Sequence, residues 1–342
     1  MSSMSTPTAS AVRRLPLAAV ALVATLLLAA CGGGSTTAGG SSTAAASGGA
    51  FPVAVDHKYG TTEVKAEPKR VVTLGLSDQD VVLALGTKPV GAIDWFKETP
   101  YGKWPWTQSL WGSTPPEVVG ERDEYNMEKI AGLKPDLILA QYSGMKQEQY
   151  DTLSKIAPVV AQPKGFEDYQ APWQDSARLA GKALGKADEV EKLIKGIDDK
   201  FAAAKTAHPE FAGKSAVVAD AYQPGTYSVF SPNDPKMLFL TQLGFTVPAK
   251  LKEAVGTENV VDLSYERFDV IDVDRLVWLI ADPASTDQIK NEALYKNLKV
   301  VQEKRDLFVP YDEPPVGAAM SFNTVLSIPY ALEQVLPLLS AK

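Results

Sequence analysis

The sequence predicts an α/β fold in which two doubly wound lobes are joined by a single long helix. Short apolar strands alternate with helices across residues 70–160 and again across 216–309, a rhythm typical of parallel sheets with helices on both faces. Between these halves, apolar residues recur at spacings of three and four, with no proline between Pro172 and Pro209. The predicted divisions are an N-terminal lobe over residues 51–170, a bridging helix over 171–207 and a C-terminal lobe over 208–342.

The first half of the chain alternates short strands with short helices. Residues 70–74 are a β-branched run that ends at Gly75, and residues 77–85 have helical spacing, with Ser77 or Asp78 as the N-cap. The remaining predicted elements are strands at 90–93, 136–140 and 159–160 and helices at 127–133 and 150–156.

The second half resumes the same rhythm after the bridging stretch. Glycine weakens a helix interior by up to about 1 kcal/mol relative to alanine, so a break near Gly185 is compatible with the bridging pattern. Residues 323–339 predict a terminal helix that is bent or broken at Pro329, with Pro337 as a second candidate. The other predicted elements are strands at 216–219, 276–280 and 307–309 and a helix at 236–243.

The N-terminus has the anatomy of a secretory signal peptide. Arg13 and Arg14 precede an apolar stretch that ends in small residues directly before Cys31, the single cysteine of the chain. The stretch is too short and alanine-rich for a good membrane-spanning helix, which needs about 20 apolar residues. The segment resembles a bacterial lipobox, so we expect residues 1–30 to be removed and Cys31 to be lipidated; export by the Sec or the twin-arginine route stays open.

The composition indicates how the exported protein is held at the membrane. Residues 31–50 contain Cys31 followed only by Gly, Ser, Thr and Ala, which predicts a flexible tether. Without residues 1–30 the chain has 32 basic and 41 acidic residues, a net charge of −9. This balance excludes a nucleic-acid binder and gives no attraction to an anionic membrane, so the lipid must supply the anchor. We expect a monomer on the extracytoplasmic face of the cell membrane.

Three runs of sequence carry a family resemblance. Residues 119–138 contain Asn126-Met127-Glu128-Lys129-Ile130 followed by Leu133-Lys134-Pro135-Asp136-Leu137-Ile138, and residues 75–91 and 264–274 add two shorter runs. In this order they resemble the substrate-binding proteins of ABC importers for ferric siderophores, haem and cobalamin. The similarity spans roughly residues 68 to 335. It implies two doubly wound lobes bridged by a rigid helix, as in class III periplasmic binding proteins, with the ligand between the lobes and limited hinge closure.

The resemblance also implies how the protein meets its permease. In the family, one glutamate of each lobe pairs with arginines of the permease, and the matching positions are Glu128 and Glu266. Such charge pairs steer encounter and fix register. Without the resemblance, each glutamate would be read as a solvated residue favoured by a helix dipole.

Aromatic residues are dense between Trp95 and Trp111, where no helical or strand period is visible, so the segment predicts a long loop. Such rings suit the walls of a large, flat, partly apolar ligand, although some of them could cover the end of the sheet instead. Arg122 offers a forked donor for carboxylate, catecholate or hydroxamate oxygens, with a salt bridge to a neighbouring acid as the alternative. The predicted ligand-binding residues are Trp95, Trp104, Trp106, Arg122, Tyr125, Tyr142, Tyr222, Tyr227 and Phe230.

Acidic residues and histidines are the remaining candidates for the site. Asp312 and Glu313 could line the cleft or belong to a polar loop. The only histidines are His57 and His208, far apart, so direct metal binding is not expected and iron should arrive already chelated. No cofactor is expected.

Catalysis has little support. The segment around Ser77 resembles a nucleophile elbow but lacks its last glycine, and no histidine is well placed to serve as its base. The favoured hypothesis is capture of a ferric siderophore and its delivery to an ABC permease. The alternatives are a haem or cobalamin-like ligand, a surface hydrolase using Ser77, and a receptor-like lipoprotein that has lost transport.

Overall fold

The computed structural model describes residues 51–95, 104–223 and 225–341. The chain divides into two units, Met1–Ser47 and Gly48–Lys342, and all described residues belong to the second. The predictions for residues 1–50, including removal of the signal peptide and lipidation of Cys31, lie outside the described residues.

The N-terminal lobe is built on a six-stranded sheet with the strand order β6-β5-β4-β3-β7-β8. Its strands pair in parallel except β6, which returns antiparallel to β5. The central strands are fully buried, which explains why their sequences read as continuous apolar runs. The strands are β3 (Val71–Thr73), β4 (Gly91–Asp94), β5 (Glu117–Glu121), β6 (Glu124–Tyr125), β7 (Leu137–Ala140) and β8 (Val159–Ala161).

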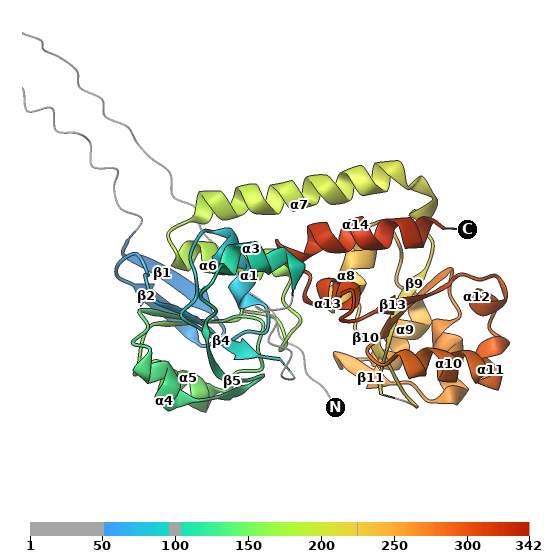
Figure 1. Ribbon diagram of the computed structural model, residues 1–342, viewed down its shortest axis with the longest axis horizontal. Helices are drawn as coiled ribbons and strands as arrows, with labels where there is room; N and C mark the ends of the chain where they lie inside the picture. Colours follow the sequence, from blue (N-terminus) through green and yellow to red (C-terminus); the bar gives the residue numbers. More distant parts are fainter. Residues whose placement is uncertain (1–50, 96–103, 224, 342) are drawn as a thin grey trace, which may run out of the picture. The chain divides into compact units, whose positions relative to one another are not determined.

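Helices cover both faces of this sheet, as Figure 1 shows for the blue and green part of the chain. A separate antiparallel hairpin of β1 (Val53–His57) and β2 (Gly60–Val64) precedes the sheet. The N-terminal helices are α1 (Asp78–Ala84), α3 (Pro105–Trp111), α4 (Met127–Gly132) and α5 (Gln147–Leu153). The prediction of a loop from Trp95 to Trp111 is wrong from Pro105 onward, where α3 lies. Pro105 takes the first helical position, where a backbone N–H would have no partner within the helix, so its missing N–H costs nothing.

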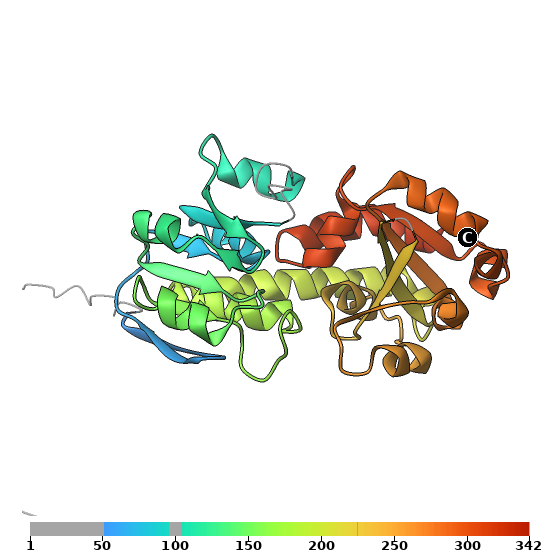
Figure 2. The same ribbon diagram turned by 90° about the horizontal axis from the view of Figure 1, so that it is seen from below.

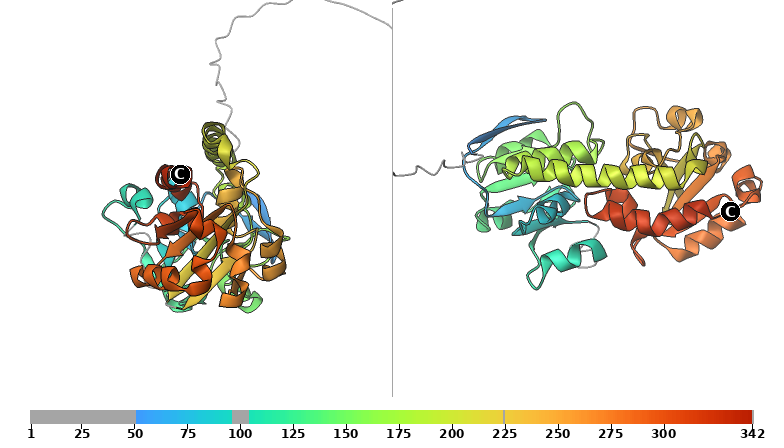
Figure 3. Two further views of the ribbon diagram at one scale, coloured as in Figure 1. Left: turned by 90° about the vertical axis from the view of Figure 1, so that its right-hand side faces the viewer. Right: turned by 90° about the horizontal axis from the view of Figure 1, so that it is seen from above.

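The bridging stretch forms two helices, α6 (Trp173–Ala183) and α7 (Ala187–Ala207), which separate at Gly185 in a left-handed conformation. The side of α7 that carries Val190, Ile194, Ile197 and Phe201 is buried. Figure 2 shows α7 extending from the N-terminal lobe to the C-terminal lobe, and Figure 3 shows it running beside α14 (Ser327–Ser340). The division at residues 171 and 207 stays a prediction.

The C-terminal lobe is built on a five-stranded sheet with the order β11-β10-β9-β12-β13. Strand β12 pairs in parallel with β9 and β13, whereas β10 is antiparallel to both of its neighbours. The strands are β9 (Ala216–Gln223), β10 (Thr226–Phe230), β11 (Val260–Asp262), β12 (Arg275–Ile280) and β13 (Asp306–Pro310).

Short helices pack on this second sheet. They are α8 (Pro235–Gln242), α9 (Ala249–Val255), α10 (Pro283–Asn291), α11 (Ala293–Lys296), α12 (Lys299–Gln302) and α13 (Val316–Phe322), with 3-10 turns η1 (Pro209–Phe211) and η2 (Tyr265–Ile271). The structure therefore confirms the predicted fold class of two α/β lobes with a long helix between them.

The prediction of one terminal helix over residues 323–339 is wrong at its start. Helix α13 ends at Asn323, whose backbone is left-handed (φ 48°), and α14 begins four residues later. Pro329 therefore falls in the first turn of α14, where its missing N–H breaks no hydrogen bond, and it does not interrupt the helix. Pro337 lies within the last turns of the same helix.

Candidate ligand-binding site

The turns after β3 and β7 are tied together by one buried carboxylate at the edge of the N-terminal sheet. Asp78 accepts backbone N–H groups from Gly75 (3.1 Å), Gln141 (2.8 Å) and Tyr142 (3.1 Å). Burial raises the pKa of Asp78, and the three N–H donors oppose that shift. A Cβ on Gly75 would lie 2.2 Å from Asp78 Oδ1, so this turn requires glycine. Of the two residues predicted as N-cap, Ser77 or Asp78, Ser77 occupies that position without a side-chain cap bond, and Asp78 joins the two turns.

Arg122 stands at the tip of the hairpin between β5 and β6. Its backbone is left-handed (φ 51°), which is uncommon for a residue with a side chain, and its N–H donates to Asp94 O at 2.8 Å. The guanidinium lies over two rings, 5.0 Å from the centre of Trp95 and 5.8 Å from that of Tyr169. About half of the side chain (48%) stays exposed. Stacking on the two rings therefore orients the planar guanidinium fork.

Asp123 positions the residues around this arginine. Its carboxylate accepts the N–H of Gly144 at 2.9 Å and the hydroxyl of Tyr169, and it lies 3.7 Å from Arg122 Nε. The ring of Tyr142 meets that of Tyr169 edge-on, with centres 5.3 Å apart. The salt-bridge alternative for Arg122 is thus present, but as a long contact that coexists with the stacked guanidinium.

Burial keeps the tyrosine hydroxyls of this wall protonated. It is the main cause that raises the pKa of Tyr125, Tyr142 and Tyr169 above the ordinary value of 10. The pKa of Tyr142 is raised further by Asp234 and Tyr311 of the C-terminal lobe and lowered by Arg122. A neutral phenol has one proton to donate, and that of Tyr169 goes to Asp123. The effects of Asp234 and Tyr311 on the pKa of Tyr142 come from the other lobe.

The opposing wall in the C-terminal lobe has a buried charge pair. Lys236 Nζ lies 3.0 Å from Asp234 Oδ1 and 3.9 Å from the ring centre of Phe230. Asp220 faces the same ammonium, and burial raises the pKa of Asp220 to about 6, with Lys236 opposing the shift and Asp234 adding to it. The predicted site residue Phe230 is therefore covered by Lys236 and is itself buried.

Two tryptophans fill the junction of the lobes instead of lining an open cleft. Trp104 stacks on Trp106 (4.9 Å between ring centres) and contacts Phe322 of α13 (4.6 Å). The indole N–H of Trp106 donates to Asp80 Oδ2 at 3.1 Å, and its ring lies 5.4 Å from Tyr330 of α14. Trp104 is 2% exposed, so its predicted contact with a ligand is corrected to a packing role.

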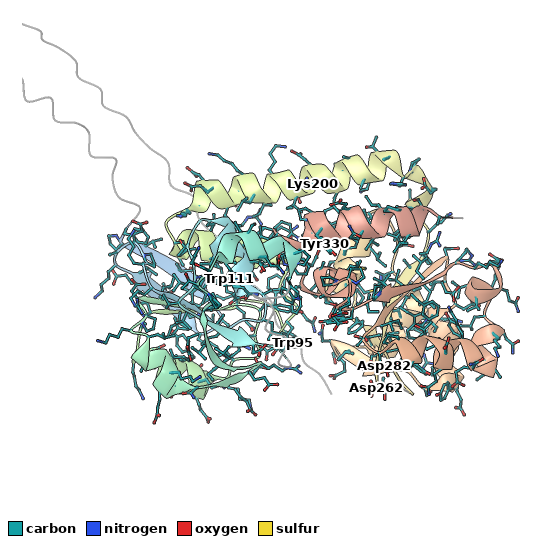
Figure 4. All side chains as sticks on the ribbon, in the orientation of Figure 1. Trp95, Trp111, Lys200, Asp262, Asp282 and Tyr330 are labelled. Atoms are coloured by element: carbon teal, nitrogen blue, oxygen red, sulfur yellow. The ribbon has the colours of Figure 1, made fainter. Side chains whose placement is uncertain are left out.

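Trp95 remains the tryptophan placed for a ligand. Figure 4 shows it at the edge of the N-terminal lobe nearest the other lobe, and its ring meets Phe322 edge-on at 6.2 Å. The side chain of Trp106 is half-buried beside Tyr330, which Figure 4 labels on α14. Tyr125 and Tyr142 are half-buried and pack on the same aromatic cluster as Trp95.

Tyr227 lies in the core of the C-terminal lobe, and its role in ligand binding stays a prediction. It is 2% exposed and packs against Tyr265, Phe268 and Trp278, all within the C-terminal lobe. The side chain of Tyr222 lies outside the described side chains, although its backbone is part of β9. Tyr169 was not among the predicted residues. It follows β8, so it meets the criterion by which Tyr142 was selected, namely a tyrosine that follows the end of a strand.

Two hollows in the surface lie close to the residues described above. One of about 810 Å³ is lined by Glu167, Asp168 and Gln170 of the N-terminal lobe and by 231–233 and 256–259 of the C-terminal lobe. The other, about 590 Å³, is formed by the C-terminal lobe and is lined by Phe308, Asp312 and Glu313 among others. A volume of this size suits a small-molecule chelate, and the first hollow has walls from both lobes.

The two glutamates at the predicted docking positions are exposed. Glu128 lies in the first turn of α4, and Glu266 lies in the first turn of η2. Helix α4 and the strand β11 that precedes η2 lie on the side of the molecule away from α7 (Figure 1).

The residues needed by the other interpretations are engaged elsewhere. His57 bonds to Thr62, and His208 bonds to Glu210 and stacks on Phe211, so neither serves Ser77 as a base. Within residues 51–95, 104–223 and 225–341, no group of three or more His, Cys, Asp or Glu side chains could hold a metal ion. Over the same described ranges, no helix has the length and apolar character needed to cross a membrane.

Comparisons with known proteins agree with this architecture. Residues 71–310 match the model of the periplasmic binding protein family. The chain is 35% identical over 251 residues to the Fe(3+)-citrate-binding protein YfmC of Bacillus subtilis (strain 168), covering 71% of this chain and 73% of that one. It is 32% identical over 260 residues to YhfQ of the same organism, which is named a substrate-binding lipoprotein of an ABC transporter, covering 73% and 78%.

A solved structure extends the likeness to a ligand complex. PiaA of Streptococcus pneumoniae TIGR4 in complex with ferrichrome superimposes with a TM-score of 0.72 at 31% identity, covering 84% of this chain and 97% of that chain. The chain therefore belongs to the periplasmic binding protein family, whose members are substrate-binding proteins and not enzymes. The predicted family is confirmed, and no cofactor is indicated.

Proposed function

We propose that this family member captures a ferric siderophore between its lobes and delivers it to the permease of an ABC importer. The observation that carries the proposal is the oriented guanidinium of Arg122, stacked on Trp95 and Tyr169, with the protonated hydroxyl of Tyr142 on the same wall. A permanent cation and a neutral phenol match the oxygen-rich surface of a ferric chelate, and the rings match its apolar parts. The names of the relatives, which include ferric citrate and ferrichrome binding, support the same ligand class.

The test is a titration of intrinsic tryptophan fluorescence with a ferric hydroxamate, a ferric catecholate, ferric citrate and haem. Trp95 lies under Arg122, so a bound ferric chelate should quench its emission. Absence of quenching by every ferric chelate would refute the proposal. Saturable quenching by haem or by a cobalamin alone would favour the alternative ligands.

Arg122 should carry much of the ligand affinity. Arg122→Ala removes a charged donor whose hydrogen bonds contribute about 1.5–3 kcal/mol, so we expect Kd to rise roughly 10- to 100-fold. The matched control is Arg178→Ala, because Arg178 is a similarly exposed arginine of α6 that pairs with Glu191 away from the site. Equal Kd values for the two variants would remove Arg122 from the site.

We further propose that the protein is anchored by a lipid on Cys31 and docks on its permease through Glu128 and Glu266. Charge reversal at both glutamates should abolish uptake while leaving the Kd for the chelate unchanged, since both side chains are exposed and neither lines the walls described above. Lost affinity would place them in the ligand site instead. Cys31→Ala should release the protein from the membrane fraction without changing Kd; continued membrane retention would refute the anchor.

A further inference from the structure

Two residues of the N-terminal lobe have left-handed backbones and lie against each other. Arg122 has φ 51° and Tyr169 has φ 64°, and the guanidinium of Arg122 lies 5.8 Å from the ring centre of Tyr169. Residues other than glycine seldom adopt this conformation, and they keep it only where their surroundings hold them in place. The two residues come from separate segments, the hairpin between β5 and β6 and the segment that follows β8. Asp123 connects these segments.

The carboxylate of Asp123 is bonded at both oxygens. Its Oδ1 accepts the N–H of Gly144 at 2.9 Å, and its Oδ2 accepts the hydroxyl of Tyr169. A Cβ on Gly144 would lie 3.0 Å from Oδ2 and 3.1 Å from the Tyr169 oxygen, so glycine at this position leaves room for the bond. Burial and the bond to Asp123 raise the pKa of Tyr169, with Arg122 opposing the shift, so the hydroxyl keeps the proton that it donates.

The ion pair between Arg122 and Asp123 is longer than such pairs usually are. Nε of Arg122 lies 3.7 Å from Oδ2, the same oxygen that accepts the tyrosine hydroxyl. Hydrogen-bonded pairs of guanidinium and carboxylate are about 2.7–2.9 Å apart. A guanidinium that closed on Asp123 would shift from its place over the rings of Trp95 and Tyr169. Tyr169 opposes this closure at both partners, since its hydroxyl holds the carboxylate and its ring holds the guanidinium.

We propose that Tyr169 is a positioning residue for Arg122: its hydroxyl holds Asp123 back, so that the guanidinium stays stacked over Trp95 instead of closing on the neighbouring acid. The inference rests on the proposed function, in which Arg122 binds the ferric chelate. Tyr169 then contributes to affinity through Arg122 and not by donating to the chelate, because its one proton goes to Asp123.

The test begins with Tyr169→Phe, which keeps the ring beneath Arg122 and removes the bond to Asp123. Ferric citrate, a ferric hydroxamate and a ferric catecholate are the probes in calorimetric titrations. For each chelate that binds the wild type, Kd should rise roughly 3- to 10-fold in Tyr169→Phe. Adding Asp123→Asn should restore most of the affinity, because a neutral amide attracts the guanidinium less than a carboxylate does. In a chain that carries Arg122→Ala, Tyr169→Phe should have no further effect.

Three outcomes of these titrations would overturn the proposal. The first is an unchanged Kd in Tyr169→Phe. The second is a loss of affinity that Asp123→Asn does not restore, because Tyr169 would then support the fold alone. The third is a loss that adds to the effect of Arg122→Ala, because Tyr169 would then contact the chelate itself.

Tyr295→Phe is the matched control. The hydroxyl of Tyr295 also donates to an aspartate, Asp306, at 2.6 Å, but Tyr295 is buried in the core of the C-terminal lobe. This variant should have a lower Tm and the Kd of the wild type. A rise in Kd equal to that of Tyr169→Phe would overturn the proposal, because lost stability would explain both.

A crystal structure of unliganded Tyr169→Phe separates this inference from the proposed function. In that variant the guanidinium of Arg122 should lie within about 3 Å of the Asp123 carboxylate. An unmoved Arg122 would overturn the proposal whether or not a chelate binds. If no ferric chelate binds the wild type but Arg122 moves onto Asp123, the proposed function fails and the positioning role of Tyr169 is supported.

Discussion

Replacing Asp80 with asparagine should make the protein more stable in alkaline solution and leave it nearly unchanged in strongly acidic solution. Asp80 is fully buried where the lobes meet, and its Oδ2 accepts the indole N–H of Trp106 (3.1 Å) and the hydroxyl of Thr324 (2.5 Å). Burial raises the pKa of Asp80 from 3.8 to about 7, against the effect of both donors. Its Oδ1 has no partner among the described residues.

The magnitude follows from this shift. Because the pKa of Asp80 is higher in the folded protein than in the unfolded chain, the folded state holds the proton more tightly, and stability falls as pH rises from about 4 through 7. A difference of about three pKa units corresponds to roughly 4 kcal/mol of ionisation cost above pH 8. The pKa of about 7 already includes the effect of both donors, and neutral asparagine keeps an oxygen for them. The expected gain at pH 9 is therefore about 4 kcal/mol.

The assay is urea unfolding at pH 5, 7 and 9 for the wild type and Asp80→Asn, with Asp199→Asn as the control. Asp199 is an exposed aspartate that pairs with Lys195, so its replacement should shift stability by less than about 1 kcal/mol at every pH. The stability difference between Asp80→Asn and wild type should grow from about 1.5 kcal/mol at pH 5, where only the unfolded carboxyl is ionised, to its maximum at pH 9. A difference that is constant with pH would refute the reasoning, since Asp80 would then be ionised without cost.

Three further predictions concern other named contacts. His57 is buried, its Nε2 bonds to Thr62 (2.9 Å), and its Nδ1 accepts the N–H of Tyr59. Burial lowers the pKa of His57 from 6.5 to about 4. Between pH 4 and 6.5 the unfolded chain therefore binds the proton more tightly than the folded protein does. Wild-type stability should therefore fall by about 2 kcal/mol more than that of His57→Asn between pH 8 and pH 5 in urea unfolding, and parallel pH profiles would contradict this. Gly75→Ala places a Cβ against the Asp78 carboxylate and should lower the free energy of unfolding, measured by chemical denaturation, by about 2–4 kcal/mol. The control Gly132→Ala, where the Cβ meets no atom within 4 Å, should be neutral or stabilising. Equal effects of the two substitutions would exclude the close approach at Gly75 as the cause. Thr324→Val removes the hydroxyl that donates to Asp80 and should cost about 1–3 kcal/mol, with Thr324→Ser close to wild type, and no difference between the two variants would show that the bond between the lobes contributes nothing.

The positions of the buried parallel strands could be predicted because their apolar runs are local and uninterrupted. Strands β7 and β12 lie within a residue of their predicted bounds, since every residue between Leu137 and Ala140 and between Leu276 and Ile280 is buried. The helix from Pro105 to Trp111 escaped prediction because its seven residues make fewer than two turns. Its buried face, with Thr107 and Trp111, is therefore too short to show a helical period in the sequence.

The candidate site was only partly predictable for a different reason. Arg122 was predicted from the chemistry of its guanidinium, and Tyr142 from its place after a strand end, which is a local property. Tyr227 also follows a turn, but it points into the core of its own lobe, and the face to which a strand residue points depends on register. The bond from Asp80 to Thr324 joins residues 244 positions apart, and no local pattern predicts such a pair.

The contacts between the lobes bear on how the protein can open. Helix α7 joins the lobes on one side, where it packs against α14. Nearer the ligand walls, Trp104 and Trp106 contact Phe322 and Tyr330 across the junction, and Asp80 binds Thr324 beside them. A large hinge rotation would have to separate these packed rings and leave the Asp80 carboxylate buried without its threonine donor, which is costly. Small relative movements of the two lobes are therefore expected, with ligand exchange depending mainly on the exposed side chains around Arg122.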